Sequence, residues 1–273
     1  MCKLAIVTKH DSAQLGQIIT NVWRAMSATE RDGFGAAWIS PDGKIGFAKS
    51  SHPTLLPELP AFCAAFSDGN GLPSNGGELI IHGRTATCGV NVANTHPMTS
   101  HNSALVHNGV VSSKRFHNTD TTCDSELLLH AWKQDGIDAV AADITGYYAF
   151  AILQRIKGKT VLDVVRDDRA SLKAGKIGLD AWGFATTDDL LRIIGASPVA
   201  DFKTNTHASF VNGKIYSVES FKPAQADKSL ELKADLAFGS HRPKYYSGST
   251  NWRGKQAELA AERDAAMADW PNY

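Results

Sequence analysis

Residues 1–7, MCKLAIV, constrain what this chain can fold into more than any other stretch. Removal of Met1 would leave a thiol and a free α-amine on Cys2, so that one residue supplies both a nucleophile and its base. The apolar, β-favouring run at residues 4–7 predicts a short buried strand directly after Cys2. Such a strand would hold the terminus inside the fold, whereas chain ends are ordinarily poorly ordered. The stretch therefore predicts a cysteine enzyme with its nucleophile at the N-terminus.

Composition limits the class of partner. The chain has 273 residues with 43% hydrophobic content, which is ordinary for a globular fold with a sizeable core. Lys plus Arg and Asp plus Glu both number 28, so no broad basic field favours a nucleic acid or an anionic membrane. The sequence has neither the roughly twenty consecutive apolar residues of a membrane span nor a secretory signal. We expect a cytoplasmic protein that acts on a small molecule.

The four cysteines point away from disulfides and metal. Cys2, Cys63, Cys88 and Cys123 have no C-x-x-C spacing, and their density is too low for a disulfide scaffold. We expect reduced thiols, no metal site and no cofactor. Buried packing is the expected role of Cys88 and Cys123.

The pattern of elements predicts an α+β fold. Apolar positions at helical spacing predict a helix over 15–26, and strands 36–39 and 44–48 flank a Pro-Asp-Gly turn. The segment 50–77 is expected to be irregular with one short helix. Further strands are expected at 79–81, 104–106, 147–153, 161–166, 183–186 and 192–195, with helices over 124–132 and 137–144 and an Asn-Gly hairpin over 210–216. Strands and helices in blocks favour antiparallel sheets with helices layered on them.

Several polar residues fit the hydrolysis of an amide through a thiol. This chemistry needs an oxyanion hole and, for a free amino acid, groups that match its α-carboxylate and α-ammonium. Arg84 could bind the carboxylate, Asp124 the ammonium, and Asn108 with the N–H of Gly109 the oxyanion. Each of these residues alone is ordinarily structural: a charge at a strand end, a helix start or a turn. We expect the side chains of His82, His96 and His107 to form structural hydrogen bonds and not to act as catalytic acids or bases.

The combination of motifs is more specific than any one of them. Besides Cys2 and its strand, the motifs are DGFG at 32–35, HGRTATCG at 82–89, NTHP at 94–97, LVHNG at 105–109 and DSE at 124–126. Together and in this order they resemble the glutaminase domain of class II glutamine amidotransferases. The resemblance covers roughly residues 2 to 220.

The resemblance implies a four-layer αββα sandwich of the N-terminal nucleophile hydrolase type. It implies that Cys2 attacks the side-chain amide of L-glutamine, with its own amine as base, and forms a γ-glutamyl thioester. Asn108 and Gly109 would form the oxyanion hole, and Arg84, Thr85, His107 and Asp124 would bind the substrate. Gly83, Thr85 and Cys88 depart from the residues common in the family, which bears on substrate affinity before mechanism.

The resemblance also gives expectations for the domain organisation and for the protein that accepts the ammonia. Residues 2–222 would form the glutaminase domain, and 223–273 a polar tail with one helix over 255–267, either a docking arm or partly disordered. That tail is too short for a second catalytic domain, so we expect ammonia to pass to a separate synthetase-type acceptor protein. Two alternatives stay open: a hydrolase of γ-glutamyl amides or peptides, and a non-catalytic assembly module.

Overall fold

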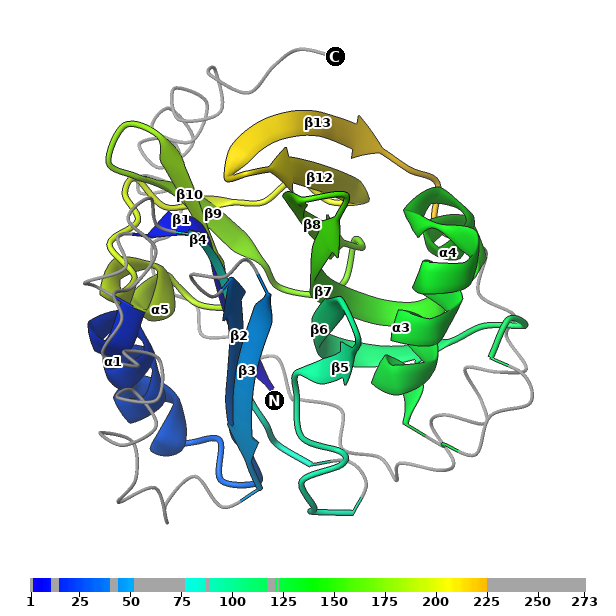
Figure 1. Cartoon of the computed structure of the whole chain (residues 1–273), viewed down its shortest axis with the longest axis horizontal. Helices are drawn as coiled ribbons and strands as arrows, with labels where there is room; N and C mark the ends of the chain where they lie inside the picture. The colour runs from blue at the N-terminus through cyan, green and yellow to red at the C-terminus, as the bar shows by residue number, and fades with distance from the viewer. Residues whose placement is uncertain are drawn as a thin grey trace, which may run out of the picture.

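Two antiparallel β-sheets pack face to face, and helices cover the outer face of each (Figure 1). The computed structural model describes residues 2–10, 15–39, 44–51, 77–86, 89–116, 121 and 123–224. In Figure 1, α1 and α5 lie on the left of the sandwich and α3 and α4 on the right. This arrangement is the αββα sandwich that the sequence predicted.

The first sheet has seven strands with β1 at its centre. Its order is β11 (Ala200–Asp201), β9 (Lys173–Ile177), β10 (Ala181–Ala185), β1 (Lys3–His10), β4 (Gly77–Gly83), β2 (Phe34–Ile39) and β3 (Ile45–Ser50). Strand β1 pairs with β10 on one side and β4 on the other. The predicted strand after Cys2 is therefore fully enclosed, and its side chains at Leu4 and Ile6 are completely buried.

The second sheet has six strands. Its order is β13 (Lys214–Ser220), β12 (Thr206–Val211), β8 (Lys159–Arg166), β7 (Thr145–Ile156), β6 (Ser103–Ser112) and β5 (Met98–Ser100). The predicted Asn-Gly hairpin joins β12 to β13, with both turn residues, Asn212 and Gly213, at positive φ. Such angles match the twist of the flanking strands.

Three hydrophobic clusters hold the layers together. One lies between the sheets and includes Leu4 and Ile6 of β1 and Val106 of β6. The second packs α1 (Leu15–Ser27) and α5 (Asp188–Ile193) on the first sheet, and the third packs α3 (Asp124–Asp135) and α4 (Ile137–Asp143) on the second. The apolar face predicted for α1 is confirmed, because Ile19 and Val22 are fully buried.

One predicted strand is wrong. Residues 192–195 were expected to form a strand, but most of this segment belongs to the end of α5 and the turn after it. The helix begins after Thr187, whose hydroxyl accepts a hydrogen bond from the N–H of Leu190 at 3.3 Å. Leu190 and Leu191 are then buried on the first sheet. A helix cap and one buried face thus outweigh the β-favouring isoleucines.

Strand β6 is longer than the sequence indicated. The expected strand was 104–106, whereas β6 continues to Ser112 and pairs residue by residue with β7. The motif that follows the short apolar run therefore lies inside a strand, not in a turn. The predicted helix at 255–267, the predicted turn at 41–43 and nearly all of 50–77 fall outside the described residues.

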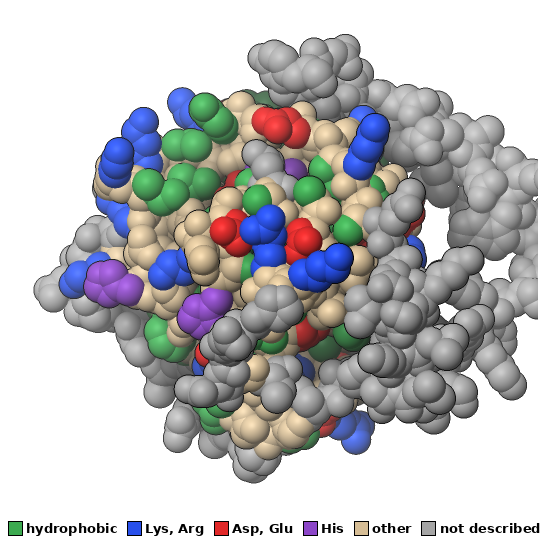
Figure 2. Space-filling view, turned by 90° about the vertical axis from the view of Figure 1, so that its right-hand side faces the viewer, with side chains coloured by type: hydrophobic (Ala, Val, Ile, Leu, Met, Phe, Trp, Pro, Cys, Tyr) green, Lys and Arg blue, Asp and Glu red, His purple; other side chains and the backbone are tan. Residues whose placement is uncertain are grey.

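The surface over α3 and α4 carries acidic and basic side chains interspersed with one another (Figure 2). Arg115, for example, forms ion pairs with Asp135 at 2.8 Å and Asp143 at 3.5 Å. Mixed charge of this kind is typical of a solvated face. None of the helices in the described part of the chain is long and apolar enough to cross a membrane.

Candidate active site

Cys2 lies at one end of the space between the two sheets. Side chains alternate between the faces of a strand, and Leu4 and Ile6 both point into the core between the sheets. Cys2 precedes β1 in the same alternation, so its thiol is on that side. On the second sheet, Asn108 lies on the same face of β6 as Ala104 and Val106, which belong to the core between the sheets.

The backbone of Thr85 holds the Cys2 thiol. The N–H of Thr85 donates to Sγ at 3.4 Å, and the thiol donates to the carbonyl oxygen of Thr85 at 3.3 Å. Burial raises the pKa of Cys2, and Glu30 raises it further; the Thr85 contact and the positive charge of Arg84 act in the opposite direction. The resting thiol is therefore protonated, and a reaction at Sγ needs a base.

Glu30 supports this contact and was not singled out from the sequence. Its buried carboxylate accepts a hydrogen bond from the hydroxyl of Thr85 and lies 3.5 Å from Nζ of Lys3. Thr29 donates to the same carboxylate at 3.0 Å. The only signal in the sequence is position, since Glu30 stands two residues before the motif at 32–35.

Arg84 is a buried cation next to Cys2, with 4% of its surface exposed. Its Nη2 donates to the carbonyl of Gly89 at 3.1 Å. Its backbone is fixed by Asp32 and Gly33: the Asp32 N–H donates to the Arg84 carbonyl at 3.1 Å, and the Arg84 N–H donates to the Gly33 carbonyl at 2.8 Å. A guanidinium fixed in this way is suited to a carboxylate.

Asn108 and Gly109 occupy the middle of β6. Asn108 is buried and pairs with Ala149, while Gly109 pairs with Tyr148. Gly109 has a φ of 143°, and a Cβ there would lie 2.0 Å from the carbonyl oxygen of Tyr147. Only glycine fits this position, and it brings the two backbones unusually close.

Asp124 is the first residue of α3. Its Oδ2 accepts from the N–H of Val111 at 3.0 Å, and its Oδ1 accepts from the hydroxyl of Ser125 at 3.2 Å. These bonds tie the start of α3 to the end of β6. They fix a carboxylate against Val111, two residues beyond Gly109 on the same strand.

Tyr147 was missed by sequence reasoning. Burial raises the pKa of Tyr147, and the charges of Cys2 and Asp124 raise it further. The side chain is 42% exposed. Alternation along 147–151 gives a signal, because Tyr147 shares a face with Ala149 and Ala151 of the core between the sheets.

Three buried histidines join the sheets behind this site. His82 Nε2–H donates to the carbonyl of His107 at 3.0 Å, and the rings of His82 and His96 are 4.1 Å apart. His107 Nδ1 lies 3.0 Å from Oγ of Ser125. Burial lowers the pKa of all three, that of His82 to about 3, so the imidazoles are neutral at pH 7.

The predicted site residues thus gather at one end of the sandwich, though in two groups. Cys2 and Arg84 lie near each other after β1 and β4, and Asn108, Gly109 and Asp124 lie on β6 and at the start of α3. Thr85 and His107 have partners of their own, Glu30 for the Thr85 hydroxyl and Ser125 for the His107 ring. Within the described residues, no three His, Cys, Asp or Glu side chains are arranged to hold a metal ion.

Comparison with known proteins places this geometry in a class. The enzyme called the allosteric regulatory enzyme of purine biosynthesis has the same fold, with a TM-score of 0.63 and 21% identity over 81% of this chain and 49% of that one. Glutamine phosphoribosylpyrophosphate amidotransferase from B. subtilis gives 0.60 and 20%, also over 81% and 49%. The chain thus spans about half the length of either structure. The fold is that of the N-terminal nucleophile hydrolases.

Comparison with sequence families is more specific than the comparison of folds. A model of the family described as "Glutamine amidotransferase domain" matches residues 43–174. This match covers slightly under half of the chain, and with the shared fold it supports a class II glutamine amidotransferase domain. A glutamine aminotransferase class-II domain protein from Silicibacter pomeroyi also aligns, with a TM-score of 0.49 and 14% identity over 82% of this chain and 100% of that one. No curated protein matches the sequence.

Proposed function

We propose that this protein hydrolyses the side-chain amide of L-glutamine to glutamate and ammonia, with Cys2 as the nucleophile. One observation carries the proposal: a thiol lies beside a buried guanidinium, and the adjoining strand β6 and helix α3 present an asparagine, a glycine N–H and a carboxylate. These are the groups that acyl transfer from a free amino acid requires. The family match includes the last three of these groups and begins after Cys2.

The base in this proposal is the α-amine of Cys2, exposed by removal of Met1. Because burial keeps the thiol protonated, the amine must take the proton from Sγ, directly or through a water, as the thiolate attacks the amide carbon. The tetrahedral oxyanion accepts hydrogen bonds from the Asn108 side chain and the Gly109 N–H. The ammonium of Cys2 then protonates the leaving nitrogen, which departs as ammonia.

Hydrolysis of the resulting γ-glutamyl thioester completes the cycle. The amine of Cys2 removes a proton from water, the hydroxide adds to the thioester carbonyl, and glutamate leaves as the thiol is restored. Arg84 binds the α-carboxylate of glutamine and Asp124 its α-ammonium. Thr85 supports Sγ through its backbone, and His107 supports Asn108 from the adjacent position of β6.

We further propose that residues 2–222 are sufficient for this chemistry and that ammonia passes to a separate synthetase-type acceptor protein. Residues 223–273 are the proposed docking element. The described chain supports the boundary in one respect: Phe221 still packs on the helix side of the second sheet. A fragment ending after Ala224 should therefore retain glutamine hydrolysis.

Cysteine replacement tests the proposal. Cys2→Ala should lower ammonia release from glutamine by on the order of a thousandfold or more, because the nucleophile is gone. Cys123→Ala, which removes a buried thiol at the start of α3, should keep the activity. Mass spectrometry should find Met1 absent from the active protein and a γ-glutamyl adduct on the N-terminal peptide. Activity of Cys2→Ala near that of the wild type would refute the assignment.

The same assay decides between glutamine and larger substrates. The wild-type protein is offered glutamine and a panel of γ-glutamyl amides and peptides at equal concentration. A preference for glutamine is expected, since the proposal assigns both charged ends of a free amino acid to Arg84 and Asp124. Preference for a γ-glutamyl peptide would favour the hydrolase alternative.

A further inference from the structure

A cavity lies on the other face of β7 from Cys2. Its volume is about 280 Å³, and it is bounded by the end of α4, the start of β7, residues 167–169 after β8, and residues 223–224 after β13. Tyr147 shares a face of β7 with Ala149 and Ala151 of the core between the sheets, whereas Tyr148 packs in the cluster beneath α3 and α4. The cavity is thus separated from the glutaminase site by the sheet itself.

Two buried polar atoms in this cavity have no hydrogen-bond partner within the described residues. They are the hydroxyl of Tyr148 and Oδ2 of Asp167, and each residue is only 1% exposed; Oδ2 has an ion pair with Nε of Arg169 at 3.7 Å but accepts no hydrogen bond. Oδ1 of Asp167 is fully used, since it accepts from the N–H groups of Arg169 at 3.0 Å and Ala170 at 2.7 Å. Buried polar groups without partners are costly and uncommon, so each calls for an explanation.

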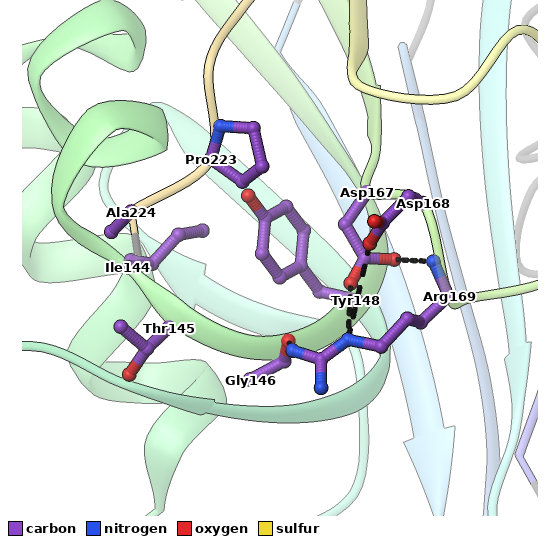
Figure 3. Close-up of a pocket in the computed structure, with 9 residues that line it drawn as sticks. All are labelled: Ile144, Thr145, Gly146, Tyr148, Asp167, Asp168, Arg169, Pro223 and Ala224. Atoms are coloured by element: carbon purple, nitrogen blue, oxygen red, sulfur yellow. Dashed lines mark hydrogen bonds and ion pairs between the residues drawn. The ribbon is translucent and has the colours of Figure 1, made fainter. Parts of the chain in front are cut away.

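The charge around these atoms favours a positively charged ligand that donates hydrogen bonds. Among the residues that line the cavity, Asp167 and Asp168 are acidic and Arg169 is basic, and its Nε lies 3.7 Å and 3.9 Å from their carboxylates. The guanidinium also donates to the carbonyl of Gly146. Figure 3 shows these three charged residues on one side of the Tyr148 ring. The lining therefore carries an excess of one negative charge.

The remaining wall is apolar and small. Ile144 and Pro223 line the side of the cavity away from the carboxylates, and the hydroxyl of Tyr148 points toward Pro223 (Figure 3). The volume is at the lower end of the range for small-molecule sites. A fitting ligand has a cationic head and a short apolar tail.

We propose that this cavity binds a small primary amine. The ammonium group donates hydrogen bonds to Oδ2 of Asp167 and to the hydroxyl of Tyr148, and the alkyl chain lies against Ile144 and Pro223. The site is distinct from the one that binds glutamine, because the two lie on opposite faces of β7.

Ligand-observed NMR on the full chain tests this site without any assay of glutamine. The probe is n-butylamine, with 1-butanol and butyrate as matched neutral and anionic controls. We expect saturation transfer to the amine alone. Tyr148→Phe, which keeps the ring and loses only the hydroxyl, should weaken butylamine binding about tenfold, and Asp167→Asn should weaken it at least as much.

Matched variants outside the cavity test whether loss of any tyrosine hydroxyl or aspartate charge weakens butylamine binding. Tyr216→Phe on exposed β13 and Asp180→Asn in the exposed turn before β10 should bind butylamine as the wild type does. Asp167 also accepts hydrogen bonds from two backbone N–H groups, so thermal unfolding is recorded for each variant. If Asp167→Asn fails to fold, the affinity of Tyr148→Phe for butylamine tests the proposal. Equal binding of butylamine and 1-butanol, or unchanged affinity in Tyr148→Phe, would overturn the proposal.

Discussion

At the scale of single residues, the amide of Asn108 is the group whose contribution to rate can be isolated most cleanly. It is buried on β6, one residue from the glycine that supplies the second proposed donor. Asn108→Ala should lower kcat by on the order of a hundredfold and change KM little, because the oxyanion forms only in the transition state. Steady-state kinetics of ammonia release measure both parameters.

An asparagine outside the site provides the control for this variant. Asn21→Ala on α1 removes an amide that interacts with Gln17 on the helix surface, and it should leave both parameters unchanged. A rise in KM alone for Asn108→Ala would mean that the amide binds the ground state and has no oxyanion role.

Candidate site residues could be predicted from the sequence where they belong to a motif, and not elsewhere. Arg84, Asn108 and Asp124 stand in recognisable motifs, so their residue types and their order along the chain were enough to suggest them. Glu30 and Tyr147 belong to none of these motifs. Glu30 precedes β2, which pairs with β4, and Tyr147 lies in β7, which pairs with β6; these pairings join residues more than thirty positions apart and leave no local pattern.

At the scale of elements, local signals located most helices and strands but not their partners or ends. The strand after Cys2 and the helix over 15–27 follow from apolar periodicity. The extension of β6 beyond residue 106 depends on its ten-residue pairing with β7. The segment 192–195 contains isoleucines that favour a strand, and only burial of Leu190 and Leu191 under a capped first turn makes α5 a helix.

The β6–β7 ladder supplies the prediction at this scale. Gly146 has a φ of 123°, and a Cβ there would lie 2.0 Å from the carbonyl oxygen of Val110. Gly158, in the turn after β7, also has a positive φ, 81°, but no atom within 4 Å of its Cβ position. Gly158→Ala should cost about 1 kcal/mol from backbone strain alone, and Gly146→Ala should cost more because a backbone atom must move.

Urea denaturation measures both free energies of unfolding. Equal losses for the two variants would show that the ladder accommodates a side chain at Gly146 without displacement of Val110.

For the molecule as a whole, the three neutral histidines make stability depend on pH. In the unfolded chain their pKa is near 6.5. In the folded protein burial lowers it, to about 3 for His82. The unfolded state therefore binds more protons below about pH 6.5, and the free energy of unfolding should fall as pH drops from there toward about 3.

Buried carboxyl groups act in the opposite direction. Burial raises the pKa of Glu78 and Asp167, so their contributions to stability grow as the pH falls. A variant is needed to isolate the histidines. His82→Gln should reduce the loss of stability between pH 7.5 and pH 5, whereas His130→Gln, on the exposed side of α3, should not. Parallel pH dependence in wild type and His82→Gln would contradict this account.

The contact between the Thr85 N–H and Sγ of Cys2 also makes the amide of Thr85 a spectroscopic reporter. In the proposed γ-glutamyl thioester the sulfur shares its electrons with a carbonyl group, which makes it a weaker acceptor than the resting thiol, and the S–H that donates to the Thr85 carbonyl is gone. The ¹⁵N and ¹H frequencies of this one backbone group would then change each time the sulfur is acylated and return when glutamate leaves. Turnover could be followed from the enzyme's side, at a single resonance, without a label on the substrate.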